Sequence, residues 1–448
     1  MNTLPINGRI VIIDDDINQA RPLMEELGKR RLPYLYYDGN PENLPISGTL
    51  NDVRLLFLDI NLQGNSFRPV KELYPIIHAI LQRVISPNNF PYVLVCWSRN
   101  IEDYNYIIEQ LYQQMRDRSP ICSIPLSKAD FFTMTGEKTD DYDEKIELLF
   151  TRISDEISQH ISFSNLLQWE NHIHAAANHA LNESLSCIAN DWDSTADWIF
   201  TKWGLAYAGR RFKAQNSSEK LKSAFFTLNH FMQEAMDIEI SNGVPPDSRF
   251  NEDSSDREES LLHFNEKLIF SFCQTAPKEP GRIVITNAEL DTYKDTLGTF
   301  LRESSTIIPI VRKEGMSDKD LRKAIDKHLS KVRERIYQQW DIFKLVINPI
   351  CDFAQDKLRV NRVIPGIFIP AEFYNLIIRN SDAIYVSPKF HYTKKDKDYF
   401  FILDFRYFTS EQHDNGESSL KIKQIVLAEI LSKLSRHINR QGLLFIDE

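Results

Sequence analysis

The sequence has few cysteines, and their placement argues against a disulfide framework. Its 448 residues include five cysteines, an odd number, and no two of them are spaced as C-x-x-C. They are scattered along the chain at Cys96, Cys122, Cys187, Cys273 and Cys351. Scattered single cysteines are typical of reduced thiols in a cytoplasm. We therefore expect a cytoplasmic protein without disulfides.

Long apolar runs are also missing. No stretch reaches the roughly 18 unbroken apolar residues that a membrane helix needs. The N-terminus has only a brief apolar run before three acidic residues, unlike a signal peptide. Basic residues are in deficit, since the formal net charge is -10. Nucleic acids and anionic membranes attract basic surfaces, so we expect neither of them as a partner.

Several signatures of catalysis and cofactor binding are absent as well. The sequence contains no P-loop, no dinucleotide glycine fingerprint, no H-E-x-x-H and no zinc finger. It does contain 42% hydrophobic and 11% aromatic residues, which is ample for packed cores. A folded chain of this length has room for two or three domains.

The first third of the chain alternates short apolar runs with amphipathic stretches. Apolar residues at helical spacing predict helices at 18–27, 70–81 and 101–111. The short apolar runs predict strands at 9–13, 34–37, 53–58, 92–97 and 121–126. This alternation predicts an α/β fold with a doubly wound, parallel, five-stranded sheet whose strand ends share one edge.

Acidic residues directly follow two of these predicted strands. Asp14 and Asp15 come after the strand 9–13, and Asp59 comes after the strand 53–58. If the two strands are neighbours, three carboxylates meet at the edge where open α/β sheets keep their chemistry. Such a cluster is too repulsive to persist without a cation. Mg²⁺, held by a few carboxylates and waters, fits best.

Two further polar residues complete a set that resembles the response-regulator receiver family. Ser98 follows the fourth predicted strand and Lys128 follows the fifth. The interval of 45 residues from Asp14 to Asp59 (59 − 14) is one that such domains usually show. The resemblance covers residues 1–142 and implies a flavodoxin-like receiver domain.

The resemblance also implies a role for each of these residues. Asp59 would accept a phosphoryl group from a phosphohistidine of a cognate histidine kinase, and Ser98 and Lys128 would contact the phosphoryl oxygens. A phosphoryl group in transfer spreads negative charge over its oxygens, which a cation and an ammonium can stabilise. The implied ligands of Mg²⁺ are Asp14, Asp15, Asp59 and the main-chain carbonyl of Asn61.

The sequence departs from the family pattern around the fifth strand. Ala129 rather than proline follows Lys128, and Pro125 stands where many receivers carry an aromatic switch residue. The intervals from Asp59 to Ser98 and from Ser98 to Lys128 are longer than usual. These departures concern the output switch more than phosphorylation. The alternative is that these acids, serine and lysine fall by chance at the strand ends of a noncatalytic sheet.

Beyond the receiver the pattern becomes helical. Apolar residues at helical spacing predict long helices over 143–240. We interpret His172, His174 and His179 as partly solvated helix residues, because no second half of a metal site accompanies them. A segment rich in proline, glycine and acidic residues, 241–260, predicts a flexible linker or loop.

Residues 261–448 predict a C-terminal α+β domain. Ser317 has the pattern of a helix cap, and apolar residues at helical spacing follow it. A last helix is expected at about 420–440. Period-two patterns predict a small antiparallel sheet or barrel from strands at 344–347, 363–369, 383–386 and 399–405.

Cys351 lies in the most motif-like text of this second half. It could act as a nucleophile with His391 as base, beside Asp352, in a catalytic domain that the receiver regulates. No pairing of spacings supports that arrangement. We interpret Cys351 as a buried structural cysteine beside an Asp-capped turn.

Three functions are therefore open. The first is a phosphate-accepting signalling protein, the second is a receiver-regulated enzyme around Cys351, and the third is a transcription factor. The acidic charge and the lack of a basic recognition helix argue against the third. The long receiver and unfamiliar C-terminal domain also resemble the stand-alone receiver partner of Detocs-like bacterial anti-phage two-component systems. That resemblance implies a phosphate buffer, which competes with an effector carrying its own receiver; it specifies neither the kinase nor the oligomeric state.

Overall fold

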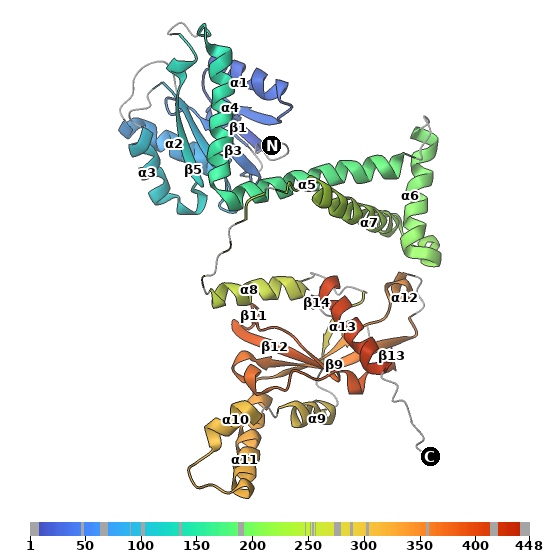
Figure 1. Ribbon diagram of the computed structural model, residues 1–448. Helices are drawn as coiled ribbons and strands as arrows, with labels where there is room; N and C mark the ends of the chain where they lie inside the picture. Colours follow the sequence, from blue (N-terminus) through green and yellow to red (C-terminus); the bar gives the residue numbers. More distant parts are fainter. Residues whose placement is uncertain are drawn as a thin grey trace. The chain divides into compact units, whose positions relative to one another are not determined.

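The chain forms two compact units in the computed structural model. The N-terminal unit comprises Met1–Ile199 and Phe225–Asp253, and the C-terminal unit comprises Phe200–Ala224 and Ser254–Glu448. Figure 1 labels the helices and strands. The residues described are 9–45, 49–62, 70–89, 91–99, 104–133, 137–186, 192–246, 248–250, 252, 255, 257–272, 279–286, 290–301, 304–354, 358–412 and 420–439.

A parallel sheet forms the centre of the N-terminal unit. Its strands are β1 (Arg9–Ile13), β2 (Tyr34–Tyr37), β3 (Val53–Leu58), β4 (Val93–Ser98) and β5 (Cys122–Ser127). They lie in the order β2-β1-β3-β4-β5, and every pairing is parallel. This is the order of flavodoxin-like doubly wound folds, so the predicted fold class is confirmed. The central strands are continuous apolar runs because both of their faces are covered.

Four helices cover the two faces of this sheet. They are α1 (Ile17–Lys29), α2 (Val70–Val84), α3 (Tyr104–Gln114) and α4 (Tyr142–Gln159). Leu23 of α1 and Phe150 of α4 belong to one apolar cluster, on one face. Ile77 of α2 and Ile107 of α3 belong to a second cluster, on the other face. The predicted start of α3 at 101–103 lies outside the described residues.

Long helices follow the receiver-like sheet, as predicted. They are α5 (Ile161–Leu185), α6 (Trp192–Ala208) and α7 (Ser217–Gly243). The first turns of α5 still belong to the receiver core, because Phe163 and Leu167 are buried in the same cluster as α4. Farther along, α5 and α7 pack through alanines, with Ala176, Ala180 and Ala235 buried between them. Helices fill both ends of the predicted 241–260 loop, since α7 ends at Gly243 and α8 starts at Glu258.

An antiparallel sheet forms the centre of the C-terminal unit. Among the described residues its main path is β10-β12-β9-β8-β7, with β11 added to β12 and β13 added to β9. The path has two ends, so this is the predicted antiparallel sheet in its open form and not a barrel. A separate pair joins β6 (Phe270–Phe272) to β14 (Leu420–Ile422). The other strands are β7 (Ile283–Ile285), β8 (Asp341–Val346), β9 (Val360–Pro370), β10 (Ile384–Val386), β11 (Phe390–Tyr392), β12 (Lys397–Asp404) and β13 (Thr409–Gln412).

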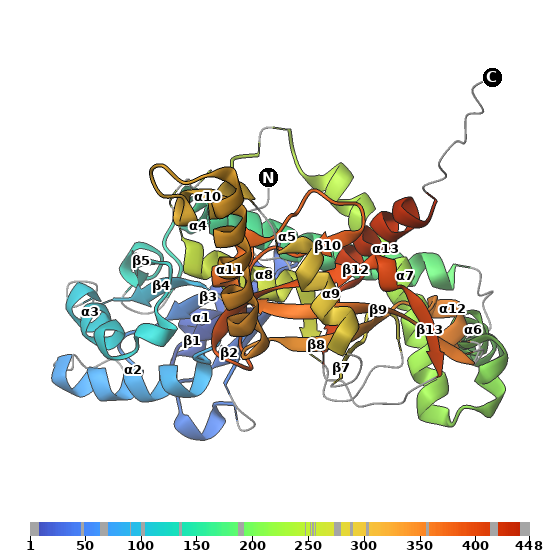
Figure 2. The same ribbon diagram turned by 90° about the horizontal axis from the view of Figure 1, so that it is seen from below.

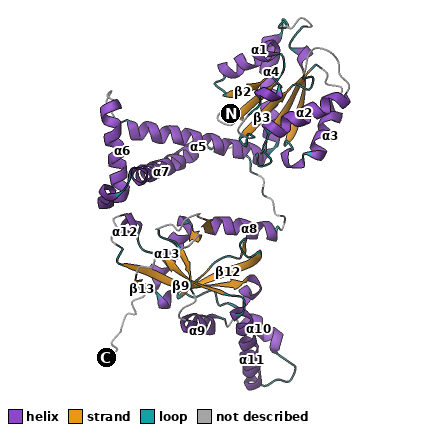
Figure 3. Ribbon diagram, turned by 180° about the vertical axis from the view of Figure 1, so that it is seen from behind, coloured by secondary structure: helices purple, strands orange, loops and turns teal. Residues whose placement is uncertain are grey.

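Helices cover both faces of the C-terminal sheet (Figure 3). One face packs against α13 (Gln424–Ile438), and the other packs against α9 (Leu290–Phe300) and α11 (Asp318–Tyr337). Figure 2 looks onto α9 and α11 in front of the sheet. The remaining helices are α8 (Glu258–Ile269), α10 (Ser304–Val311) and α12 (Ile350–Ala354).

Two details of the C-terminal prediction can be checked at single residues. Ser317 caps α11 as predicted, because its side chain accepts a hydrogen bond from the main-chain N–H of Asp320. The predicted start of the last helix at 420 is wrong. Leu420 and Ile422 are buried on alternate positions of β14, and the helix begins only at Gln424. None of the helices among the described residues combines the length and the apolar composition of a bilayer span.

Candidate functional site

Three carboxylates meet at the carboxyl edge of the N-terminal sheet. Asp14 and Asp15 follow β1 and Asp59 follows β3, and one oxygen from each side chain lies within 4.8 Å of the others. They meet because β1 and β3 are neighbours, with Ile13 opposite Leu58. Asp14 is fully buried and Asp59 is 6% exposed. The predicted convergence of the three acids is therefore present in the structure.

Lys128 places one positive charge inside this cluster. Its Nζ lies 2.7 Å from Asp14 Oδ2 and 2.5 Å from Asp59 Oδ2, and the side chain is 1% exposed. A short 3₁₀ turn after β5 holds it there, and Ser127 caps this turn by accepting a hydrogen bond from the Ala129 N–H. Three carboxylates and one ammonium leave a formal charge of −2 (−3 + 1). That charge fits a divalent cation coordinated by oxygen ligands.

Burial sets the electrostatics of this site. It raises the pKa of Asp14 to about 7; repulsion from Asp59 adds to the rise and Lys128 opposes it. Burial alone would lower the pKa of Lys128, but the carboxylates of Asp59 and Asp14 outweigh burial and hold that pKa above its ordinary value. Lys128 is therefore charged at neutral pH. Asp14 needs a further cation if it is to stay ionised, because a metal binds the deprotonated carboxylate.

Main-chain and side-chain hydrogen bonds orient Asp14. The Asp16 N–H donates to Asp14 Oδ1 at 3.0 Å, and the Tyr36 hydroxyl donates to the Asp14 carbonyl at 2.7 Å. Asp16 itself caps α1, because its carboxylate accepts a hydrogen bond from the Asn18 N–H at 3.0 Å. The third acid of the Asp14–Asp16 run is thus a helix cap, a role that its position just before the helix could have indicated. No feature of the sequence indicated that Tyr36 would contact Asp14.

Asp59 is oriented by the residues around it. Its Oδ1 accepts a hydrogen bond from the Asn61 N–H at 2.9 Å, and its main-chain N–H donates to the Ile13 carbonyl at 2.8 Å. Asn61 is therefore adjacent to the cluster. A metal-binding role for its carbonyl stays a prediction.

Ser98 lies at the same edge of the sheet. It is the last residue of β4, is fully buried, and pairs with Ser127 of β5. Since β4 lies between β3 and β5, Ser98 is placed between the strand that carries Asp59 and the strand that leads to Lys128. Its contact with a phosphoryl group stays a prediction.

Aromatic residues that the sequence analysis did not single out lie next to Ser98 and Lys128. Trp97 precedes Ser98, and its ring centroid lies 4.9 Å from that of Phe131 and 6.1 Å from that of Phe132. Phe132 in turn lies 5.8 Å from Tyr142, the first residue of α4. The two phenylalanines follow the Lys128 turn directly, which was the available signal. Aromatic contacts thus connect β4 with α4 even though position 125 is a proline.

The prediction of a buried Cys351 is wrong. Cys351 is exposed in the short helix α12, where Phe353 is the residue that packs against the sheet. Its Sγ lies 3.8 Å from Asp352 Oδ1. His391 lies in β11 and contacts Asp398 at 2.9 Å and Asp396 at 3.4 Å. Among the described contacts nothing joins Cys351 to His391, so the structure does not assemble the proposed nucleophile and base.

The three histidines of α5 are partly solvated, as the sequence analysis expected. His174 and His179 are exposed and His172 is half-buried. His179 Nδ1 lies 3.4 Å from Glu239 Oε1 across the α5–α7 pair. Within the described part of the chain, no histidine belongs to a group with metal-binding geometry.

Comparison with known proteins gives only distant likenesses. No protein-family model and no curated protein matches the sequence. Among solved structures, the chain is similar to an adenylate cyclase from Rhodopirellula baltica, with 16% identity, 36% of this chain and 97% of that chain covered, and a TM-score of 0.20.

Two other solved structures are response regulators. One, from Burkholderia pseudomallei with a phosphorylated aspartic acid, calcium ion and citrate, is 13% identical, with 35% of this chain and 90% of that chain covered and a TM-score of 0.18. The other, FixJ from B. japonicum, is 12% identical, with 52% of this chain and 96% of that chain covered and a TM-score of 0.16. Likenesses this weak do not assign a function. The strand order of the sheet, with carboxylates and a lysine at its carboxyl edge, is what makes the fold receiver-like.

Proposed function

We propose that this protein is a phosphate-accepting signalling protein in which Asp59 takes a phosphoryl group from a phosphohistidine of a cognate histidine kinase. One observation carries the proposal. Lys128 Nζ lies buried within 2.7 Å of both Asp14 and Asp59, in a cluster that keeps a net charge of −2 (−3 + 1). A purely structural ion pair would balance its charges. Three carboxylates around one ammonium instead leave two formal negative charges, which matches a divalent cation.

Asp59 is positioned to act as the nucleophile. An oxygen of its carboxylate would attack the phosphorus, the P–N bond to the histidine ring would break, and the ring would leave as neutral imidazole if its other nitrogen carries a proton. The products are an aspartyl phosphate and the free histidine. The Asn61 N–H on Oδ1 and Lys128 on Oδ2 fix the carboxylate before transfer, so little reorientation is needed.

The cation that we propose is Mg²⁺. Asp14, Asp15 and Asp59 would hold it, with the main-chain carbonyl of Asn61 completing the site. When bound, it would neutralise charge on the phosphoryl oxygens. Lys128 would shift from the bare carboxylate to a phosphoryl oxygen, and the hydroxyl of Ser98 would donate to another.

We further propose that the protein holds phosphoryl groups as a buffer and competes with an effector that carries its own receiver. Two features support this. The acidic net charge disfavours a DNA-binding output, and the C-terminal unit does not assemble the Cys351 and His391 pair. The resemblance to the receiver partner of Detocs-like systems would place this buffer in the cytoplasm of a bacterium, in a two-component defence against phage.

The proposal is tested by transfer from the phosphorylated kinase. Wild-type protein should take labelled phosphate and Asp59→Asn should take none. Asp130→Asn removes an exposed carboxylate just beyond Lys128 and should label normally. If it is a buffer, Asp59→Asn should make the pathway overactive in cells. A silent pathway would instead identify a forward messenger, and an unlabelled wild type would reject the receiver function itself.

A further inference from the structure

A small cavity opens on the α9 face of the C-terminal sheet. Its volume is about 200 Å³. The cavity receives residues from α9, from three neighbouring strands and from the turn after β12. The residues that matter for its chemistry are Thr292, Lys344, Pro365, Tyr407, Thr409 and Glu411.

Lys344 occupies a position where the strand pattern calls for an apolar residue. Along β8, Ile342 and Val346 point to the same face, and each belongs to a buried apolar cluster. Lys344 stands between them with its side chain 15% exposed. Burying a charged group on an inward face costs free energy unless the group has a partner. A lysine at this position therefore indicates a specific role.

The partner of Lys344 comes from a strand two places away. β9 pairs with β8 on one side, where Pro365 lies opposite Lys344, and with β13 on the other, where Val363 lies opposite Thr409. This brings Glu411 Oε1 to 2.8 Å from Lys344 Nζ, and the Glu411 side chain is 32% exposed. A cation and an anion thus lie side by side in the same cavity.

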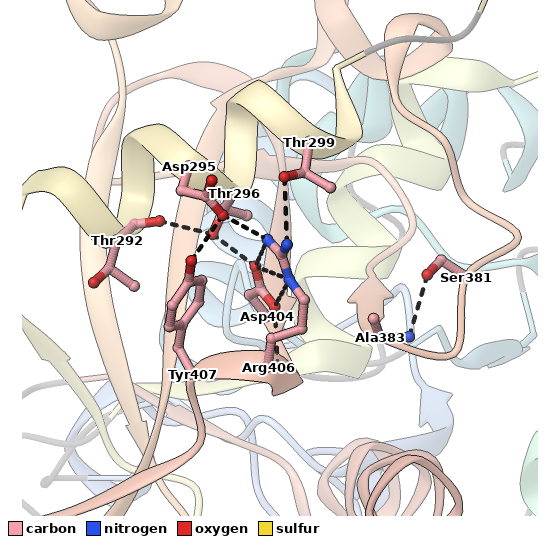
Figure 4. Close-up of polar contacts among 9 residues, drawn as sticks. All are labelled: Thr292, Asp295, Thr296, Thr299, Ser381, Ala383, Asp404, Arg406 and Tyr407. Atoms are coloured by element: carbon pink, nitrogen blue, oxygen red, sulfur yellow. Dashed lines mark hydrogen bonds and ion pairs between the residues drawn. The ribbon is translucent and has the colours of Figure 1, made fainter. Parts of the chain in front are cut away.

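A separate set of hydrogen bonds fixes the wall of the cavity (Figure 4). The Tyr407 hydroxyl donates to Asp295 at 2.7 Å, and Arg406 Nη2 donates to the same carboxylate at 3.1 Å. Arg406 also binds both oxygens of Asp404, which is 1% exposed and accepts a hydrogen bond from Thr296 at 2.8 Å. None of these bonds uses Lys344 or Glu411. Tyr407 is therefore held in place whether or not those two charges change partners, as in a preorganised binding site.

The geometry points to a binding site for a small zwitterion of α-amino-acid size, with its carboxylate on Lys344 and its ammonium on Glu411. At about 200 Å³, the cavity has room for several water-sized groups. That is too small for most drug-sized ligands, whose pockets start at about 300 Å³. The hydroxyls of Thr292 and Thr409 could satisfy the remaining polar atoms of such a ligand.

Charge explains the preference for a zwitterion. A simple anion bound to Lys344 would separate Glu411 from the Lys344 ammonium. A simple cation bound to Glu411 would separate Lys344 from the Glu411 carboxylate. A molecule with both charges replaces the protein's own ion pair and leaves neither group unpaired. The alternative is that Lys344 and Glu411 serve only to tie β13 to the sheet.

The test uses the full-length protein and a panel of probes. Glycine, alanine, serine and other free amino acids are compared with acetate and methylamine, which carry one charge each. Titration calorimetry and thermal unfolding should show saturable binding of at least one amino acid, at least tenfold tighter than acetate or methylamine. Absence of binding by every amino acid up to tens of millimolar, or equal binding of acetate, would overturn the proposal.

Variants locate the binding. Lys344→Met and Glu411→Gln should each weaken binding of the best amino acid at least tenfold. Glu372→Gln removes one partner of the exposed Arg335 ion pair in the same unit and should leave binding unchanged. Glu411→Gln keeps the size of a partly exposed side chain, so it guards against loss of folding in Lys344→Met. Unchanged affinity in a folded Glu411→Gln protein would place the ligand elsewhere and overturn the assignment.

Discussion

At the scale of single residues, Asp14 is buried where a carboxylate is difficult to keep charged. Its pKa is raised from 3.8 to about 7, first by burial. Between these two values the folded protein holds a proton that the unfolded chain has released. The free energy of unfolding therefore falls as pH rises through this window, and the whole loss is present above pH 7.

This sign predicts that Asp14→Asn stabilises the metal-free protein at about pH 8. The gain should be on the order of 1–4 kcal/mol, from a shift of about three pKa units. The gain should shrink at about pH 4, close to the ordinary pKa of 3.8, because there the Asp14 carboxyl is protonated in the folded protein and about half protonated in the unfolded chain. Urea unfolding in EDTA at the two pH values measures it. A variant less stable than wild type at pH 8 would contradict the assigned burial penalty.

The same cluster predicts which acids bind the cation. Asp15→Asn should weaken Mg²⁺ binding at least tenfold, because it removes one of three carboxylates from a site of charge −2 (−3 + 1). Asp16→Asn is the matched control, since Asn also caps a helix and Asp16 caps α1. Mg²⁺ titration followed by Trp fluorescence or calorimetry compares them. Equal affinity of wild type and Asp15→Asn would remove Asp15 from the site.

The cysteines give a prediction about reactivity. Cys351 is exposed, Cys96 is buried, and burial raises the pKa of the Cys122 thiol to about 11. Thiolate is the reactive form, so a thiol reagent at about pH 8 should modify Cys351 faster than Cys96 and Cys122. Peptide mass spectrometry over time resolves the sites. Early modification of Cys96 would contradict its burial. Cys351→Ser should change stability by less than about 0.5 kcal/mol, as expected of a surface position.

Single residues also show how far sequence reasoning reaches. The sequence predicts which polar residues gather at the carboxyl edge of the sheet, because each of them follows a predicted parallel strand. They are Asp14, Asp59, Ser98 and Lys128. The exposure of Cys351 could not be predicted, since a five-residue helix has too few positions to reveal its buried face.

At the scale of elements, an ion pair joins the receiver sheet to the long helix α5. Arg54 of β3 binds Glu170 through two hydrogen bonds of 2.8 Å, and the side chains are 9% and 22% exposed. The planar guanidinium matches the carboxylate at both oxygens, which makes this pair more specific than a surface contact.

Glu170→Gln should therefore destabilise the N-terminal unit and loosen α5. It removes the negative charge that the mostly buried Arg54 guanidinium binds, at a cost of about 1–3 kcal/mol. Hydrogen exchange of α5 and urea unfolding measure both effects. Lys145→Met, which breaks the partly exposed pair between Lys145 of α4 and the N-cap residue Asp141, should change neither. Equal exchange in both variants would show that the Arg54 contact does not hold α5.

Elements differ in how well the sequence specifies them. β1 and β3 have the predicted bounds, because continuous apolar runs mark strands that are buried on both faces. The half-buried edge strand β2 also has its predicted bounds. The short strands β11 and β14 have three residues each, too few for a period to be recognised. Their positions depend on partners that are distant in sequence.

At the scale of the whole molecule, the two units differ in the kind of contact that builds them. The receiver-like sheet follows from strands that alternate with helices along the chain, so a doubly wound parallel sheet could be predicted. The C-terminal cavity depends on β13 pairing with β9, which joins Val363 to Thr409 across 46 residues (409 − 363). No local pattern specifies that pairing, and neither Lys344 nor Glu411 could be identified as a site from the sequence.

The position of the phosphoryl group on the full-length protein tests the proposed receiver function. Full-length protein is incubated with phosphoramidate, a small donor with a P–N bond, and the modified residue is identified by mass spectrometry. We predict one phosphoryl group on Asp59, formed with Mg²⁺ present, absent in EDTA and absent in Asp59→Asn. Modification that ignores Mg²⁺, or that persists in Asp59→Asn, would contradict the account.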